Sequence, residues 1–254
     1  MKFVVIKGKT LAVLVSLLLI GCLGLAAAGH NRTVAASAAA RLLPIYCVET
    51  EENKISLGIN CAWDNGDIEE ILNALDKAQV KATFFILGQW CEKYPESVQE
   101  IAKRGHEIAS HSYTHRDMNT LTREELAQEV TKAMAVLEET CGKKPELLRP
   151  PSGAYNDLAV EVIRGLGYYP IQWDVDTLDW KGLSAGEIVR RVTEKAQPGS
   201  IVLLHSGAEN TSIALPELLR CLQESGVEIV PVGELIYKGD YTIDVQGRQH
   251  PAKS

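Results

Sequence analysis

The sequence contains no paired cysteine motif and no cluster of basic residues. Its six cysteines are scattered singly along 254 residues, and none forms the Cys-x-x-Cys pairs of a zinc ribbon, so a structural zinc site built on sulfur is excluded. The chain carries 26 Lys and Arg against 33 Asp and Glu, a net charge of −7. Because nucleic acids are bound through clustered Lys and Arg, this charge balance argues against a nucleic-acid partner.

Disulfide bonds are not expected either. Five cysteines lie outside the N-terminal segment, an odd number, and a chain of this length with 46% hydrophobic residues buries a core without covalent cross-links. We therefore predict free, buried thiols, Cys61 among them. No internal repeat or low-complexity segment interrupts the main part of the chain.

The first thirty residues differ from the rest of the chain. Three lysines, at positions 2, 7 and 9, precede twenty uncharged residues, 10–29, that are rich in Leu, Val and Ala. This pattern predicts a membrane-directed segment over 1–29 that places the following domain outside the cytoplasm. A single-pass anchor in the cell membrane is one outcome. Cleavage after the small residues 26–28 gives a secreted protein, and lipidation of Cys22 gives a lipoprotein.

Hydrophobic periodicity divides the remainder into alternating strands and helices. Residues 30–53 read as a linker with an edge strand at 42–48, residues 54–238 as the main domain, and residues 239–254 as a loose polar tail. Strands are expected at 55–59, 82–87, 107–110, 147–148, 169–173, 200–204 and 228–230, and helices at 68–78, 96–104, 122–140, 158–166, 184–196 and 213–225. This alternation predicts an α/β fold with parallel strands, as a barrel or an open sheet.

Polar side chains follow several of the expected strands. These side chains belong to Asn60, His111, Arg149, Asp174 and His205. In parallel α/β folds the carboxyl ends of the strands meet at one edge, where ligands bind. We therefore expect these side chains to form a single site.

His111 and His115 are the centre of this expected site. Their spacing of four residues, on a helical turn or a tight loop, lets two neutral imidazoles bind one divalent metal, with a third ligand from elsewhere. By itself the pair is more typical of a solvated His-rich turn than of a metal site, but the other strand-end groups favour an active centre. His106, by contrast, is expected to be structural.

Five ordered motifs resemble those of a known family. They are Lys81-Ala82-Thr83-Phe84-Phe85, His111-Ser112-Tyr113-Thr114-His115, Arg149-Pro150-Pro151-Ser152-Gly153, Asp176-Thr177-Leu178-Asp179-Trp180 and Leu203-Leu204-His205. Over roughly residues 54–237 the chain resembles the polysaccharide deacetylases, the NodB-homology domains of carbohydrate esterase family four, and most of all their membrane-anchored bacterial members. The resemblance implies a distorted (β/α) barrel and metal-dependent removal of acetyl groups from peptidoglycan or chitin-like polysaccharide.

The resemblance also implies roles for individual residues. His111 and His115 would bind Zn²⁺ or a similar divalent ion, which activates water and polarises the acetyl carbonyl. His205 would be the general acid, oriented by Asp179. Arg149 would pair with an active-site carboxylate.

The expected substrate contacts come from three further residues. The backbone around Ser152 would donate to the oxyanion, while Trp180 and Leu203 would wall the pocket for the acetyl methyl group. Read without the resemblance, Trp180 and Leu203 are equally typical of core residues, and Asp176 is typical of a turn at a strand end.

The chain departs from the family at its first motif. The family carries Thr-Phe-Asp-Asp-Gly, whose first Asp is the base and whose second completes the metal site, whereas Asn60 and Cys61 occupy those positions here. A neutral amide cannot take a proton from water. Asp64 and Asp67 follow in the same loop, and either could supply the third metal ligand or a displaced base. Asp67 is favoured as the ligand, with Asp64 second, which makes Asp64 a candidate catalytic carboxylate. Two hypotheses remain, an active deacetylase and a weak or silent member that binds glycan.

Overall fold

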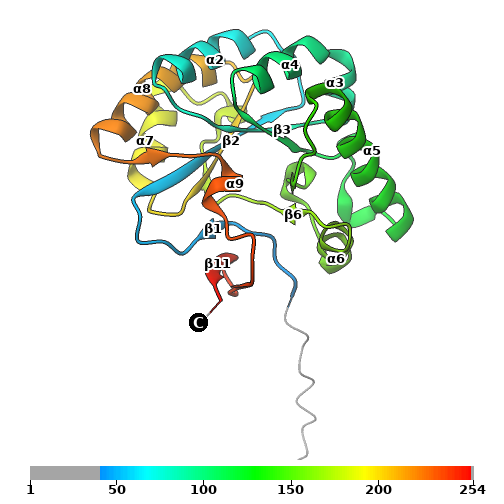
Figure 1. The fold of residues 1–254 in the computed structure, drawn as a ribbon. Helices are drawn as coiled ribbons and strands as arrows, with labels where there is room; N and C mark the ends of the chain where they lie inside the picture. The colour runs from blue at the N-terminus through cyan, green and yellow to red at the C-terminus, as the bar shows by residue number, and fades with distance from the viewer. Residues whose placement is uncertain (1–40, 253–254) are drawn as a thin grey trace, which may run out of the picture. The chain divides into compact units, whose positions relative to one another are not determined.

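Helices and parallel strands alternate along residues 41–252, which the computed structural model describes. The predictions made for the N-terminal segment and for most of the linker lie outside these residues. The helices line the outer side of a curled sheet, and a small second sheet lies below it beside the C-terminus (Figure 1). The strands are β1 (Cys47–Val48), β2 (Lys54–Cys61), β3 (Thr83–Ile86), β4 (Glu107–Ser110), β5 (Leu147–Leu148), β6 (Tyr169–Pro170), β7 (Val175–Asp176), β8 (Ile201–His205), β9 (Glu228–Ile229), β10 (Tyr241–Ile243) and β11 (Arg248–Pro251).

The large sheet is parallel throughout. Its order is β6-β5-β4-β3-β2-β8-β7, with β9 paired to the start of β2. Within the described residues, β6 and β7 are the two ends of this order, so the barrel is open between them. The architecture confirms the predicted α/β fold, a distorted (β/α) barrel of parallel strands.

Helices connect most of the successive strands of the large sheet. They are α2 (Ile68–Lys77), α3 (Gly88–Lys93), α4 (Pro95–Lys103), α5 (Arg123–Cys141), α6 (Asp157–Gly165), α7 (Ala185–Lys195), α8 (Thr211–Glu224) and α9 (Val232–Leu235). The longest, α5, begins with the capping box that the sequence predicts, between Thr122 and Glu125, and ends at Gly142 in the left-handed conformation. Helix α3 and strand β7 were not anticipated.

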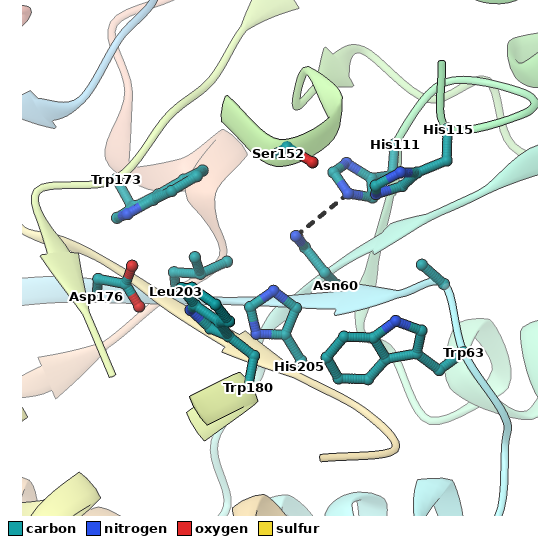
Figure 2. A pocket seen from close by; sticks show the side chains of 11 residues that line it. Asn60, Trp63, His111, His115, Ser152, Trp173, Asp176, Trp180, Leu203 and His205 are labelled. Carbon is teal, nitrogen blue, oxygen red and sulfur yellow. Dashed lines mark hydrogen bonds between the residues drawn. The ribbon is translucent and has the colours of Figure 1, made fainter. Parts of the chain in front are cut away.

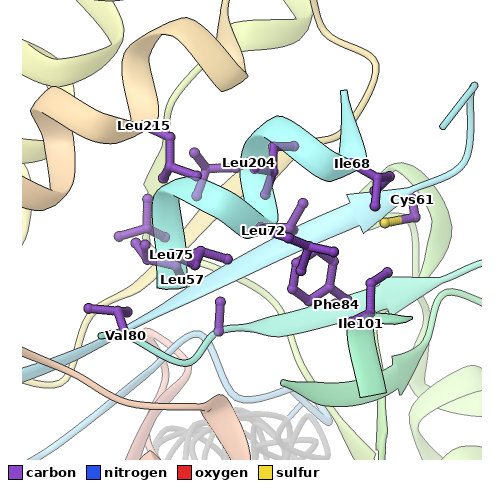
Figure 3. Close-up of a cluster of buried hydrophobic side chains, with 14 of the residues drawn as sticks. Leu57, Cys61, Ile68, Leu72, Leu75, Val80, Phe84, Ile101, Leu204 and Leu215 are labelled. Carbon is purple, nitrogen blue, oxygen red and sulfur yellow. The ribbon is translucent and has the colours of Figure 1, made fainter. Parts of the chain in front are cut away.

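The strands bury both of their faces. Leu57, Ile59 and Cys61 of β2 point to the outer side, where they pack with Leu72 and Leu75 of α2 (Figure 3). Because side chains alternate along a strand, the intervening residues of β2 point into the barrel. This alternation directs Asn60 into the barrel. Burial of both faces also explains why β8 reads as a nearly continuous apolar run, Ile-Val-Leu-Leu, rather than as alternating polar and apolar residues.

The C-terminal tail is not loose, which corrects the sequence prediction. Strand β11 pairs in parallel with β1 and antiparallel with β10, forming a three-stranded sheet. His250 of β11 lies within 2.7 Å of Glu49 and 3.0 Å of Asp244, so polar contacts hold the tail to residues near the start of the domain. The tail has few apolar residues, and its pairing partner lies about 200 positions earlier, so its composition gave no signal of the sheet.

Asp174 also lies elsewhere than expected. The expected strand at 169–173 ends at Pro170, and Asp174 precedes β7 rather than following a strand. Its carboxylate accepts hydrogen bonds from the Ser200 hydroxyl at 2.8 Å and from the backbone N–H of Ile201 at 2.9 Å, at the start of β8. Asp174 therefore links the amino ends of β7 and β8, at the end of the barrel opposite the predicted site.

The cysteines of the described residues are free, as predicted. Cys47, Cys61 and Cys91 are buried, whereas Cys141 and Cys221 are partly exposed. Burial raises the pKa of the Cys61 thiol to about 12, so it is an inert core group.

Candidate active site

A cavity of about 270 Å³ opens at the carboxyl ends of the barrel strands (Figure 2). Most of the predicted site residues meet here. Its lining consists of Asn60, Ala62, Trp63, His111, His115, Ser152, Trp173, Asp176, Trp180, Leu203 and His205.

Strands β2 and β8 place two of these side chains side by side. Asn60 and His205 are partners in the parallel register of the two strands, and Gly58 is the partner of Leu203. All four residues lie on the side of their strands that faces the interior of the barrel. The juxtaposition follows from strand pairing, so it does not depend on a flexible loop.

His205 and Asp179 form a hydrogen-bonded pair. The imidazole Nδ1 lies 2.8 Å from Asp179 Oδ1, and the backbone N–H of His205 donates to Oδ2 at 2.7 Å. Thr211 donates to the same Oδ2 at 2.7 Å. Although burial alone acts to raise it, the hydrogen bonds from His205 and Thr211 hold the pKa of Asp179 below its ordinary value. The carboxylate therefore stays ionised and fixes Nδ1–H, which leaves Nε2 for proton transfer in the cavity.

The hydrogen-bond partners of Arg149 differ from the sequence prediction, which expected a carboxylate. Its side chain is fully buried and donates to three neutral oxygens, Asn60 Oδ1 at 2.9 Å and the carbonyls of Gly58 at 3.2 Å and Gln172 at 3.3 Å. The guanidinium also lies 3.8 Å from the centre of the Phe85 ring. The prediction was wrong because the position facing Arg149 carries an amide. Burial lowers the pKa of Arg149 to about 9.

His111 and His115 lie in a tight loop rather than on a helical turn. His115 has φ 63°, and the two ring centroids are 5.0 Å apart. Nδ1 of His111 lies 2.8 Å from the carbonyl oxygen of Arg149, which can only accept, so Nδ1 carries the proton. Nε2 of His111 is then unprotonated, and its lone pair accepts a hydrogen bond from the amide Nδ2 of Asn60 at 3.3 Å (Figure 2).

These two imidazoles have the protonation that a metal requires. Burial, reinforced by the charge of His115, lowers the pKa of His111 well below its ordinary value, and burial also lowers the pKa of His115. Both rings are therefore neutral, and the backbone contact to Nδ1 of His111 orients its Nε2 as a ligand. Within residues 41–252, however, no group of three His, Cys, Asp or Glu side chains is arranged to hold an ion. In this part of the chain, His111 and His115 are thus two imidazole donors that face the cavity together.

Asp64 and Asp67 lie outside the cavity lining. Asp64 is exposed, and its Oδ1 accepts from the backbone N–H of Gly66 at 2.9 Å. Asp67 Oδ1 accepts from the backbone N–H of Gly207 at 2.8 Å, while its Oδ2 is buried without a partner. Burial raises the pKa of Asp67 to about 6. The role of Asp67 as third ligand therefore stays a prediction.

Aromatic side chains form the walls of the cavity, and two of them were not anticipated. Trp63 stacks on His205 with ring centroids 5.3 Å apart and an angle of 22° between the planes. Trp173 lies against the Cα of Gly153, where a Cβ would come within 2.9 Å of the indole. The sequence offered one clue to Trp63: it follows closely after the carboxyl end of β2, where site residues are expected. Trp180 is 49% exposed, so it is not a core residue.

Ser152, Leu203 and Asp176 also line the cavity. Ser152 lies in a short 3-10 helix, Pro151–Gly153, with φ 53°. Asp176 also forms the expected turn, because its Oδ1 accepts from the backbone N–H of Leu178 at 2.8 Å.

The chain belongs to the polysaccharide deacetylase family. The family model for polysaccharide deacetylase matches residues 48–171. A peptidoglycan-N-acetylglucosamine deacetylase from Bacillus cereus is 35% identical over 193 residues, which cover 73% of this chain and 70% of that protein. The uncharacterized protein YlxY of Bacillus subtilis is 34% identical over 76% of this chain. The present chain spans only 60% of the length of YlxY.

Solved structures agree with this assignment. Wild-type BA3943 from Bacillus anthracis, a CE4 family pseudoenzyme, superposes with a TM-score of 0.74 at 33% identity, covering 82% of this chain and 73% of that one. A BA3943 mutant with restored enzymatic activity superposes with a TM-score of 0.73 at 34% identity, covering 76% and 70% of the two chains. Among residues 41–252, no helix is long and apolar enough to cross a membrane.

Proposed function

We propose that this protein is a metal-dependent deacetylase of an acetylated polysaccharide, either peptidoglycan or a chitin-like glycan. The observation that carries the proposal is the His205–Asp179 pair, which shares one cavity with His111 and His115. A carboxylate-oriented imidazole is a general acid, and two neutral imidazoles are metal ligands. The similarity to the Bacillus cereus deacetylase supports the same substrate class.

His205 delivers a proton to the leaving amine. Asp179 keeps Nδ1–H in place, so Nε2 is the atom that carries the proton into the cavity. The indole of Trp63 covers the ring and fixes its plane. Loss of Asp179 would therefore remove the group that orients the His205 imidazole.

A divalent ion, Zn²⁺ in our proposal, would supply Lewis-acid polarisation of the acetyl carbonyl and a more acidic water when bound. His111 and His115 would hold it through ring nitrogens. The contact of Nδ1 with the Arg149 carbonyl keeps Nε2 of His111 unprotonated, and a bound ion would replace the Asn60 amide as the partner of that lone pair. Asp67, whose Oδ2 has no partner, is our candidate for a third ligand.

The remaining acetyl-binding roles fall on three lining residues. In our proposal Trp180 and Leu203 contact the acetyl methyl group and the backbone around Ser152 donates to the developing oxyanion; support comes from the position of all three residues in the cavity lining. The carbon-rich walls suit a methyl group and the apolar face of a sugar.

The amide at position 60 favours a second candidate function, that of a weak or silent family member that binds glycan. Its Oδ1 accepts from Arg149, and its Nδ2 faces His111, so neither end of the amide takes a proton from water. Asp64 and Asp67 do not line the cavity. Loss of a general base slows hydrolysis by about two to four powers of ten. The likeness to BA3943, described as a pseudoenzyme, supports the same reading.

Acetate release tests the proposal. The full-length protein loaded with Zn²⁺ is incubated with N-acetylglucosamine oligomers and with peptidoglycan, and acetate is measured over long incubations. Slow release that is lost in His205→Ala supports the enzyme. Equal release by the wild type and His205→Ala would refute it, and glycan binding without release would favour the second candidate.

We also propose that the domain acts at the outer face of the cell membrane, held there by residues 1–29. Support comes from the three lysines and the uncharged stretch 10–29 in the sequence, and from a proposed substrate that lies in the cell wall.

A further inference from the structure

The histidine loop, residues 111–115, has an uncommon backbone conformation. Ser112 and His115 have φ 69° and 63°, in the left-handed region that residues other than glycine rarely adopt. A backbone of this kind persists only where the surrounding structure determines it. The two ends of the loop are His111 and His115, so whatever holds the loop also places both imidazoles.

Glu129 of α5 accepts hydrogen bonds from the middle of the histidine loop. Its Oε2 accepts from the backbone N–H groups of Tyr113 at 3.1 Å and Thr114 at 2.8 Å, and its Oε1 accepts from the Thr114 hydroxyl at 2.6 Å. The side chain of Glu129 is only 8% exposed. Because a buried carboxylate is costly unless hydrogen bonds satisfy it, these three donors stabilise Glu129 in the position from which it holds the loop.

The N–H groups near the ends of the loop are paired locally. That of Ser112 donates to Ser110 Oγ at 3.2 Å, and that of His115 donates to Ser112 Oγ at 3.3 Å. The two N–H groups in the middle are paired through α5. Loss of the Glu129 carboxylate would therefore take the acceptor from two adjacent backbone groups and one hydroxyl.

Helix α3 contacts the carbonyl groups of the same loop. The backbone N–H groups of its first two residues, Gly88 and Gln89, donate to the carbonyls of Ser112 at 2.9 Å and Tyr113 at 3.0 Å. Glu129 binds N–H groups, whereas α3 binds carbonyls. The two helices thus contact complementary groups of one backbone segment, and Glu129 is the side chain that supplies the acceptors.

From this arrangement we propose that Glu129 is a positioning residue for the His111 and His115 imidazoles and through them sets the affinity of the metal site. The two ring centroids lie 5.0 Å apart with an angle of 77° between the planes. Glu129 does not line the cavity, so it acts on the rings through the loop backbone. Groups that orient metal ligands in this way contribute roughly 10–100-fold to metal affinity. The effect on affinity rests on the proposed metal binding, whereas the effect on the rings does not.

Zn²⁺ affinity of the full-length protein, measured by competition with a chelating dye, tests the proposal. Glu129→Gln keeps an oxygen for the two N–H groups and an amide nitrogen that can donate to the Thr114 hydroxyl, so its affinity should stay within about threefold of wild type. Glu129→Leu fills a similar space without an acceptor, and its affinity should fall at least about tenfold. Glu129→Asp withdraws the carboxylate by one methylene and should fall between the two. It supplies the measurement if the leucine variant does not fold.

Glu107→Leu is the matched control. Oε2 of Glu107 accepts from the Thr83 hydroxyl at 2.6 Å and from the backbone N–H of Gly233 at 2.9 Å, so the variant removes the same kind of acceptor from another part of the fold. It should lower the urea unfolding midpoint, as Glu129→Leu does, but leave Zn²⁺ affinity unchanged. Equal loss of affinity in the two leucine variants would overturn the proposal.

Proton NMR of the metal-free protein gives a second measurement. The nuclear Overhauser contact between the His111 and His115 rings should be present in the wild type and in Glu129→Gln and be lost in Glu129→Leu. A wild type that binds no Zn²⁺ would refute the proposed metal site, and this ring contact would then decide the role of Glu129. An unchanged ring contact in Glu129→Leu would overturn that role.

Discussion

Arg149 donates from Nη1 to Oδ1 of Asn60 over 2.9 Å, so a fully buried guanidinium is held by a neutral amide. The same amide contacts His111, the first residue of the histidine pair. A carboxylate at position 60 would occupy the same place between a cation and the proposed metal ligand, which makes this position the natural target for mutation.

Asn60→Asp should increase acetate release by at least about tenfold, because it supplies a positioned general base. The new carboxylate would pair with Arg149, whose charge keeps it ionised. The gain should disappear in Asn60→Asp combined with His205→Ala. Asn73→Asp, the same change on the exposed face of α2, should have no effect.

Acetate release by Asp64→Asn and Asp67→Asn tests whether one of these carboxylates already acts as the general base. If either carboxylate already serves as base, its loss silences the wild type, and Asn60→Asp then gains nothing. No activity in any variant, with the fold intact and metal bound, would leave the silent glycan-binding reading.

The full-length protein should bind about one Zn²⁺ per chain, and His111→Ala or His115→Ala should abolish binding, because each removes one of two imidazole ligands. Metal content after dialysis measures the effect. His250→Ala is the matched control, since His250 lies in the small sheet. Unchanged metal content in both site variants would eliminate the proposed metal site.

Gly58→Ala should destabilise the protein by roughly 1–3 kcal/mol, because overpacking a buried site displaces its neighbours. A Cβ at Gly58 would lie 2.5 Å from Nη2 of Arg149 and 3.0 Å from the Phe85 ring. Gly186→Ala in α7 is the control, because no atom lies within 4 Å of the added carbon there. It should gain up to about 1 kcal/mol from the better helix propensity of alanine. Urea unfolding midpoints measure both changes.

The His250 contacts should make stability depend on pH. Hydrogen bonds that His250 donates to the carboxylates of Asp244 and Glu49 raise its pKa above the ordinary 6.5. A histidine with a raised pKa in the folded state stabilises it below the unfolded pKa, and this contribution is lost as pH rises through the folded pKa. The Tm difference between wild type and His250→Ala should therefore be largest below pH 6.5 and shrink above it. A difference that grows with rising pH would contradict the assignment.

The full-length protein should fractionate with membranes, and deletion of residues 1–30 should release it, because uncharged residues 10–29 behind three lysines insert into a bilayer. Sedimentation after a high-salt wash distinguishes an inserted segment from electrostatic binding. Full-length protein found soluble in the cytoplasm would refute the prediction.

The sequence by itself determined the parallel α/β architecture and most of the site. Strand and helix periodicity is local, so the run 55–59 and the capping box at Thr122 were readable without a fold. The His111 and His115 pair and the Asp179 and His205 positions were readable because each lies in a short motif.

Only the tertiary structure decided which groups meet. Asn60 and Arg149 are 89 residues apart, and the partner of Arg149 depended on which side chain β2 turns into the barrel. The stacking of Trp63 on His205 and the pairing of β11 with β1 are likewise contacts between distant segments. Periodicity reports how each segment is buried. Strand register and loop direction depend on packing between segments, which no local pattern records.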